Sequence, residues 1–122
     1  MANAVNWFEI PATDLDRAQK FYESVFNCQL SKMEMGPSVM AMFPMEEGAA
    51  NAPGALVKAE GYTPSHAGSV VYFSVDDIEG TLVKVSENGG SVLNPKMGIG
   101  ENGFVATFND CEGNRVALHS IQ

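Results

Sequence analysis

The fold is decided by residues 5–26, which read VNWFEIPATDLDRAQKFYESVF. Their first part is a short run of β-forming residues that ends at Pro11, and it therefore predicts a strand. Thr13 or Asp14 can cap a helix, and the apolar residues that follow recur at three- and four-residue steps, as on one face of a helix. Asn27 can end that helix in the left-handed conformation. The stretch predicts a strand followed directly by an amphipathic helix.

The same strand-then-helix signal occurs a second time in the chain. A second apolar run predicts another strand, and Asp76 or Asp77 can cap the helix after it. Asp77 and Ile78 stand 63 residues after Asp14 and Leu15, so the start signals of the two helices coincide. Two copies of one supersecondary unit are the simplest account of this repeat.

Each copy continues with further β-forming runs that lie between turn-rich segments. The expected strands cover residues 28–35, 39–43 and 54–58 in the first copy, and 69–75, 91–93, 104–108 and 115–121 in the second. Residues 61–68 are rich in turn formers and indicate a connector. We therefore expect an α+β fold of two βαβββ modules, about residues 4–60 and 68–121, in a single domain over residues 1–122.

Length, charge and cysteine content limit the classes of function. A chain of 122 residues can build one sizeable core. Its formal net charge of −8 repels phosphates and anionic headgroups, so neither nucleic acid nor a membrane is an expected partner. No window holds the roughly 20 apolar residues of a membrane helix, and no signal-peptide pattern is present, so we expect a cytoplasmic protein. Cys28 and Cys111 are expected to be reduced thiols.

The order and spacing of several short motifs resemble a known family. These motifs are residues 8–11 with 13–18 and Phe21-Tyr22, then residues 72–77, 88–90 and 110–114. Together they resemble the vicinal oxygen chelate superfamily of glyoxalase I, bleomycin-resistance proteins and extradiol dioxygenases, and within it a branch of small bacterial glyoxalase-related proteins. The resemblance implies that the two modules form a curved eight-stranded sheet around a concave cleft that receives ligands. It also implies a homodimer.

The resemblance further implies four metal-ligand positions, one on the first and one on the last strand of each module. In this sequence they fall on Trp7, Ala55, Val70 and Ala117. Divalent ions need imidazole, carboxylate or thiolate donors, and none of these four side chains supplies one. We therefore expect no metal at these positions and no other cofactor, and we expect the metal-dependent reactions of the family to be absent.

Other side chains replace the lost ligands on the expected cleft face. Side chains alternate across a strand, so residues two positions further on share that face, namely Glu9, Val57, Tyr72 and His119. The other face of the same strands is expected to pack under the helices, and it carries Phe8, Ile10, Val71, Phe73, Val116 and Leu118. This apolar set supports the assignment of the two faces.

Two hypotheses about function follow from the cleft residues. In the first, the protein binds a small molecule without a metal, with Trp7 stacking on the ligand and Tyr72, Glu9 and His119 contacting it. In the alternative, the protein is a lyase or isomerase that uses Glu9 and His119 as acid and base, or as a displaced divalent-metal site with Tyr72 or His66. The sequence leaves the choice between binding protein and enzyme open.

Two further segments bear on the cleft. Five methionines cluster around the second and third strands, and we expect them to fill an irregular core rather than to form an adaptable cleft wall. They are Met33, Met35, Met40, Met42 and Met45. Residues 94–103 are glycine-rich and are expected to form a flexible loop near the cleft, which could close over it or serve only as a connection.

Overall fold

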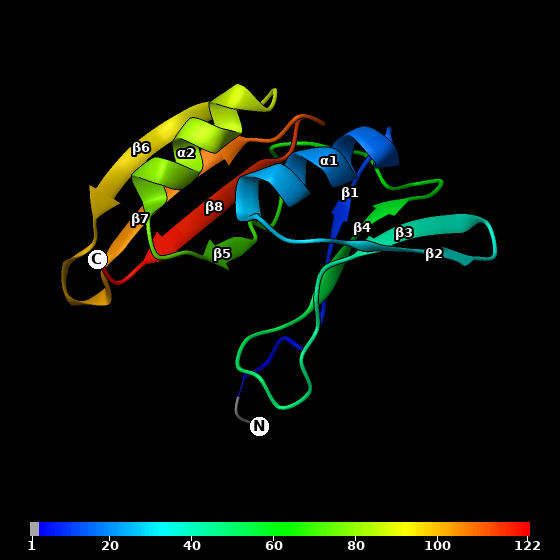
Figure 1. Cartoon of the computed structure of the whole chain (residues 1–122), viewed down its shortest axis with the longest axis horizontal. Coiled ribbons are helices and arrows are strands. Elements are labelled where there is room, and N and C mark those ends of the chain that lie inside the picture. Colours follow the sequence, from blue (N-terminus) through cyan, green and yellow to red (C-terminus); the bar gives the residue numbers. More distant parts are fainter. Residues whose placement is uncertain (1–2) are drawn as a thin grey trace.

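Two consecutive βαβββ modules make up the fold, as the sequence repeat predicts (Figure 1). The computed structural model of the chain describes residues 3–122. The first module contains β1 (Phe8–Pro11), α1 (Leu15–Phe26), β2 (Ser31–Met35), β3 (Ser38–Met42) and β4 (Gly54–Lys58). The second contains β5 (Tyr72–Ser74), α2 (Ile78–Glu87), β6 (Ser91–Gly98), the short 3-10 helix η1 (Gly100–Asn102), β7 (Phe104–Asn109) and β8 (Arg115–Ser120).

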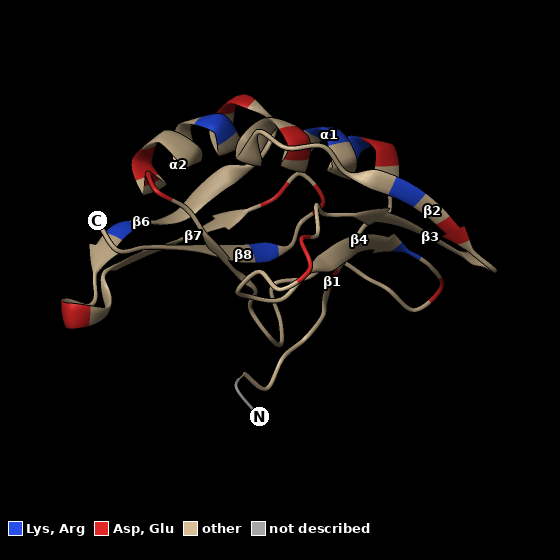
Figure 2. Ribbon diagram, turned by 60° about the horizontal axis from the view of Figure 1, so that its bottom comes forward, with Lys and Arg blue, Asp and Glu red and all other residues tan. Residues whose placement is uncertain are grey.

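The strands pair within each module and give two four-stranded sheets of the same topology. Their orders are β1-β4-β3-β2 and β5-β8-β7-β6. In each sheet the first strand pairs in parallel with the last, and the remaining pairs are antiparallel. Both helices lie side by side over one face of the sheets (Figures 1 and 2). The predicted α+β fold of two similar modules is confirmed, with the eight strands divided into two hydrogen-bonded sheets.

The helices begin at the aspartates that the sequence offers as caps. A carboxylate oxygen of Asp14 accepts a hydrogen bond of 3.1 Å from the backbone N–H of Arg17, and Asp77 does the same for the N–H of Gly80. Such bonds satisfy N–H groups that have no partner within the helix. Asn27 ends α1 with a φ of 52°, which confirms the left-handed cap. No helix within residues 3–122 is long and apolar enough to cross a membrane.

One apolar core lies beneath the helices and takes residues from both modules. The residues expected on the helix side of the strands belong to this core or pack against it. Phe73 of β5 stacks on Phe26 of α1, with ring centroids 4.5 Å apart, and also meets the rings of Phe8, Tyr22 and Phe43. A side chain of the second module therefore completes an aromatic cluster of the first.

The expectation of a flexible loop over residues 94–103 is wrong for its first half. Strand β6 continues to Gly98 and pairs with β7, with register shifts between Val92 and Asn94 and between Asn94 and Met97. β6 is an edge strand, where proline is tolerated, so Pro95 interrupts the regular register without ending the strand. The remaining residues form η1 and a tight return to β7.

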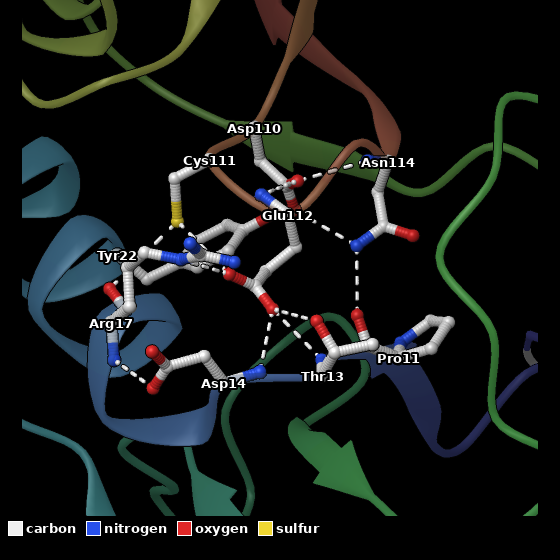
Figure 3. Close-up of polar contacts among 9 residues, drawn as sticks. All are labelled: Pro11, Thr13, Asp14, Arg17, Tyr22, Asp110, Cys111, Glu112 and Asn114. Atoms are coloured by element: carbon white, nitrogen blue, oxygen red, sulfur yellow. Dashed lines mark hydrogen bonds and ion pairs between the residues drawn. The ribbon is translucent and has the colours of Figure 1, made fainter.

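The turn between β7 and β8 docks onto the start of α1. The Glu112 side chain is 1% exposed, and one of its oxygens accepts hydrogen bonds of 2.8 Å from the backbone N–H groups of Thr13 and Asp14 (Figure 3). The other oxygen accepts a bond of 2.6 Å from Nε of Arg17. A carboxylate placed at a helix N-terminus satisfies free N–H groups and opposes the positive end of the helix dipole.

A second carboxylate in the same turn organises the interior of this junction. Asp110 is 1% exposed and accepts a hydrogen bond of 2.6 Å from the hydroxyl of Tyr22 on α1. It also accepts bonds from the backbone N–H groups of Glu112 and Asn114. The Asn114 amide donates to the carbonyl oxygen of Pro11, at the end of β1, over 2.8 Å. The second module thus fixes the strand-to-helix corner of the first.

Replacing Glu112 tests this junction. In Glu112→Gln the charge-assisted bonds to Arg17 and the helix start are weakened, and the free energy of unfolding at neutral pH should fall by about 2 kcal/mol. Denaturant unfolding measures this difference. Glu47→Gln, in the exposed loop after β3, is the matched control and should unfold like the wild type.

The same substitution has a pH signature. Burial alone raises the pKa of Glu112, but the bonds from Arg17, Asp14 and Thr13 outweigh burial and leave its pKa below the ordinary value of 4.5. The folded state therefore gains stability from Glu112 above the pKa of the unfolded chain and loses it as the pH falls through the lowered folded-state pKa. Wild type and Glu112→Gln should converge in stability over that acid range, and a constant difference would contradict this assignment.

Candidate functional site

A pocket of about 540 Å³ lies on the face of the first sheet that turns away from the helices. Its wall contains four methionines of β2 and β3, which are Met33, Met35, Met40 and Met42. Trp7, Glu9 and Tyr62 form its polar and aromatic side, and Ser38 and Val57 complete it. The pocket is therefore apolar over most of its surface and carries a single carboxylate.

Strand register explains why these side chains meet. Glu9 pairs with Ala55, which pairs with Met42, and in the next row of this face Val57 pairs with Met40, which pairs with Met33. Residues paired across neighbouring strands point to the same face of a sheet. Met40 and Val57 are 8% and 2% exposed and lie deep in the wall. Met33 and Met35 are 45% and 55% exposed and form its rim.

Two aromatic donors orient the carboxylate of Glu9. The Tyr62 hydroxyl donates to one oxygen over 2.8 Å, and the Trp7 indole N–H donates to the other over 3.2 Å. A carboxylate offers about four acceptor positions, so about one stays free on each oxygen. The hydrogen bond to Glu9, and then the negative charge of Glu9, raise the pKa of Tyr62, which keeps the phenol protonated as a donor.

Tyr62 reaches the pocket through the turn that follows β4. Gly61 has a φ of +87°, in the left-handed region that favours glycine, and the Tyr62 N–H donates to the Ala59 carbonyl over 3.2 Å. The sequence prediction placed residues 61–68 in a connector and did not single out Tyr62. The sequence feature that could have identified Tyr62 is the Gly61-Tyr62 pair, which follows shortly after β4, the strand that pairs with β1.

The structure divides the predicted site residues between the two modules. Trp7, Glu9 and Val57 lie together in the pocket. Tyr72 is on β5, is 57% exposed and does not line this pocket. His119 is on β8, and its Nε2 donates to the Asn102 carbonyl of η1 over 2.6 Å. No hydrogen bond joins Glu9 to His119 in the part of the chain that the structure describes, and their catalytic roles remain predictions.

The methionines do not all fill the core as expected. Met40 is buried, but Met33, Met35 and Met45 are about half exposed. Met45 lies in the loop after β3 and does not line the pocket. The expectation of core filling is therefore wrong for these three residues. The alternative of an adaptable wall fits the four methionines that surround the pocket.

The positions at which the family resemblance implies metal ligands do not suit a metal ion. Ala55 and Ala117 are fully buried, and Ala55 packs against Met40 and Val57. Neither these alanines nor Trp7 and Val70 carry an oxygen, sulfur or imidazole donor. Residues 3–122 also contain no group of three or more His, Cys, Asp or Glu that could hold a metal ion. His66, a candidate for a displaced site, has its Nε2 2.9 Å from Asn109 Oδ1.

The cysteines do not add a nucleophile to the pocket. Cys28 and Cys111 are both free and line no part of it. Burial, followed by the nearby carboxylates of Asp110 and Glu112, raises the pKa of Cys111 to about 12. A thiol with such a pKa is protonated at neutral pH and is a poor nucleophile.

Comparisons with known proteins agree with this fold. Residues 4–118 match the family model described as Glyoxalase/Bleomycin resistance protein/Dioxygenase superfamily. A glyoxylase-like domain-containing protein of Didymella fabae is 32% identical over 93% of this chain and 91% of its own length. A glyoxylase/bleomycin resistance protein/dioxygenase domain from Frankia sp. EAN1pec superposes with a TM-score of 0.75 at 14% identity, over 98% of both chains.

A second solved structure differs from this chain in length. Glyoxalase I from Zea mays superposes with a TM-score of 0.69 at 22% identity and covers 98% of this chain. The chain spans only 48% of the length of the maize protein. At this level of identity, both structural matches show a shared fold and nothing about substrate.

The Glu9–Tyr62 contact can be tested by titration. Removing the charge in Glu9→Gln should lower the pKa of Tyr62 towards the ordinary value of 10.0, because ionising the phenol no longer places two negative charges side by side. NMR of tyrosine labelled at the ring carbon that bears the hydroxyl resolves Tyr62 from Tyr22 and Tyr72. Glu34→Gln on β2 is the control and should leave the Tyr62 pKa unchanged, whereas equal shifts in both variants would contradict the contact.

Proposed function

The chain belongs to the Glyoxalase/Bleomycin resistance protein/Dioxygenase superfamily, and we propose that it is a small-molecule-binding member whose family metal positions are lost. The observation that carries the proposal is the pocket formed by Trp7, Glu9, Tyr62 and four methionines. Its volume of about 540 Å³ suits a small organic ligand. The fold alone does not fix the activity, so the proposal depends on this pocket.

The chemistry of the wall supports binding. Thioether side chains are flexible and polarisable, and they adapt their shape to an apolar ligand. Trp7 and Tyr62 offer aromatic surfaces, and the carboxylate of Glu9 provides one oriented polar contact. Apolar walls with a few placed polar groups are the usual composition of ligand pockets.

The contacts give less support to the alternative of a lyase or isomerase. An acid–base pair must lie within hydrogen-bond reach of a shared substrate. The hydrogen-bond partners of Glu9 are Trp7 of the first module and Tyr62 of the turn after β4, whereas His119 bonds to Asn102 in the second module. This arrangement supports a binding role for Glu9 more than a role in a catalytic pair with His119.

The assembly is proposed to be a homodimer. The maize glyoxalase I chain is about twice the length of this chain, which covers 48% of it. Two copies of this chain would supply a comparable set of modules. Sedimentation equilibrium should then give twice the chain mass of 13.1 kDa, and a mass of 13.1 kDa across the accessible concentration range would overturn the dimer.

The free thiols Cys28 and Cys111 suit the reducing cytoplasm, which we propose as the location.

Methionine methyl NMR on chelator-treated protein tests the binding function. When small apolar and amphiphilic molecules are screened, a ligand of the pocket should shift the methyl signals of Met33, Met35, Met40 and Met42. Met97, on β6 of the second module, is 59% exposed and serves as an internal control for non-specific association. Its signal should not move.

Two results would count against this function. Hits that shift Met97 as strongly as the pocket methionines would show non-specific association. Binding that disappears on chelation and returns with a divalent ion would show that a metal is required. The proposal of metal-independent binding would then be wrong.

A further inference from the structure

We propose that the pocket selects a protonated organic amine with an apolar body. This inference rests on the proposed binding function and names the class of ligand. Among the described residues that line the pocket, Glu9 is the one that carries a charge. The remaining wall is apolar or neutral, so the electrostatic preference of the pocket is set by one carboxylate.

The basic residues of the same sheet do not neutralise Glu9. Lys32 lies between Met33 and Ser31 on β2, and its ammonium pairs with Asp16 of α1 on the helix side. Lys58 follows Val57 on β4 and lines a separate pocket with Thr13. Strand alternation therefore directs both lysines away from the face that holds Glu9. In Figure 2 both helices carry several coloured charged residues, whereas β3 carries none.

The free acceptor positions of Glu9 suit N–H donors. Trp7 and Tyr62 each occupy one position on a different oxygen, which fixes the carboxylate while leaving about one position per oxygen unused. An ammonium group carries up to three N–H donors and can fill both. Hydrogen bonds with an ionised partner are about twice as strong as neutral ones, and an ammonium adds the attraction between opposite charges.

The neighbouring side chains favour the same ligand. The rings of Trp7 and Tyr62 lie beside the carboxylate, and aromatic faces attract a cation. Met40 and Val57 are nearly fully buried at the base of the pocket and offer an apolar surface to the body of the ligand. An anionic ligand would meet Glu9 and a net charge of −8, and nothing in the lining would compensate it.

The test uses three probes of the same shape that differ in charge. These are 4-phenylbutylamine, 4-phenylbutanol and 4-phenylbutyrate, titrated at neutral pH and followed by the methyl signals of Met33, Met35, Met40 and Met42. The protonated amine should bind about tenfold more tightly than the alcohol, because its hydrogen bond to Glu9 is also an ion pair, whereas the alcohol brings no charge. The carboxylate should bind more weakly than either.

Two substitutions of the same type identify the group responsible. Glu9→Gln keeps the shape and the acceptor for Tyr62 but removes the charge, and it should reduce the affinity for the amine to about that for the alcohol. Glu34→Gln removes one charge on β2, between Met33 and Met35 in sequence and outside the pocket lining. Amine binding in Glu34→Gln should stay within about twofold of the wild type, because a screened surface charge contributes little.

The outcomes separate this inference from the binding function. Tighter binding of the amine that depends on Glu9 and not on Glu34 supports both. Equal affinities of the three probes, or equal losses in the two variants, with the pocket methyls still shifting, overturn the amine selectivity and leave the binding function in place. If no probe, and no molecule of the wider screen, shifts the pocket methyls, both are overturned.

Discussion

The contact between Glu112 and the start of α1 is the constraint on which the rest of the structure depends. One carboxylate from the second module takes up backbone N–H groups of Thr13 and Asp14 and the guanidinium of Arg17. Asn114 of the same turn holds the carbonyl of Pro11, at the end of the strand that carries Glu9. The pocket is formed by the first module and Tyr62 of the connector that follows it, yet the strand that presents its carboxylate is anchored by the second module.

Side chains alternate along the strands of the first sheet, so one face of the sheet joins the core and the other lines the pocket. Ile10, Ala41 and Leu56 turn to the helices and join the common core, while Glu9, Met40 and Val57 turn the other way. The core side is completed by Phe73 from the second module. No helix among residues 3–122 covers the other side, and there Met33 and Met35 remain about half exposed.

None of the side chains at the four positions where the family resemblance implies metal ligands carries a metal donor. Alanine at positions 55 and 117 fills the sheet interior with small apolar side chains, which pack well and bind no ion. The groups around the pocket are an oriented carboxylate, two aromatic rings and flexible thioethers. Under the proposed function, these groups bind a ligand through charge and apolar contact.

The sequence by itself determined the repeat, two neighbouring candidates for each helix cap, and the two faces of the first and last strand of each module, because caps and side-chain alternation are properties of neighbouring residues. It therefore placed Glu9 and Phe8 on opposite sides, and the structure selected Asp14 and Asp77 among the candidate caps. The tertiary structure alone decided that Tyr62, 53 residues from Glu9, donates to it, and that Glu112, 99 residues from Thr13, caps the first helix. It also decided that Met33 and Met35 stay exposed and that β6 extends to Gly98. These features depend on how distant segments pack, and the periodicity of a short stretch of sequence does not predict such packing.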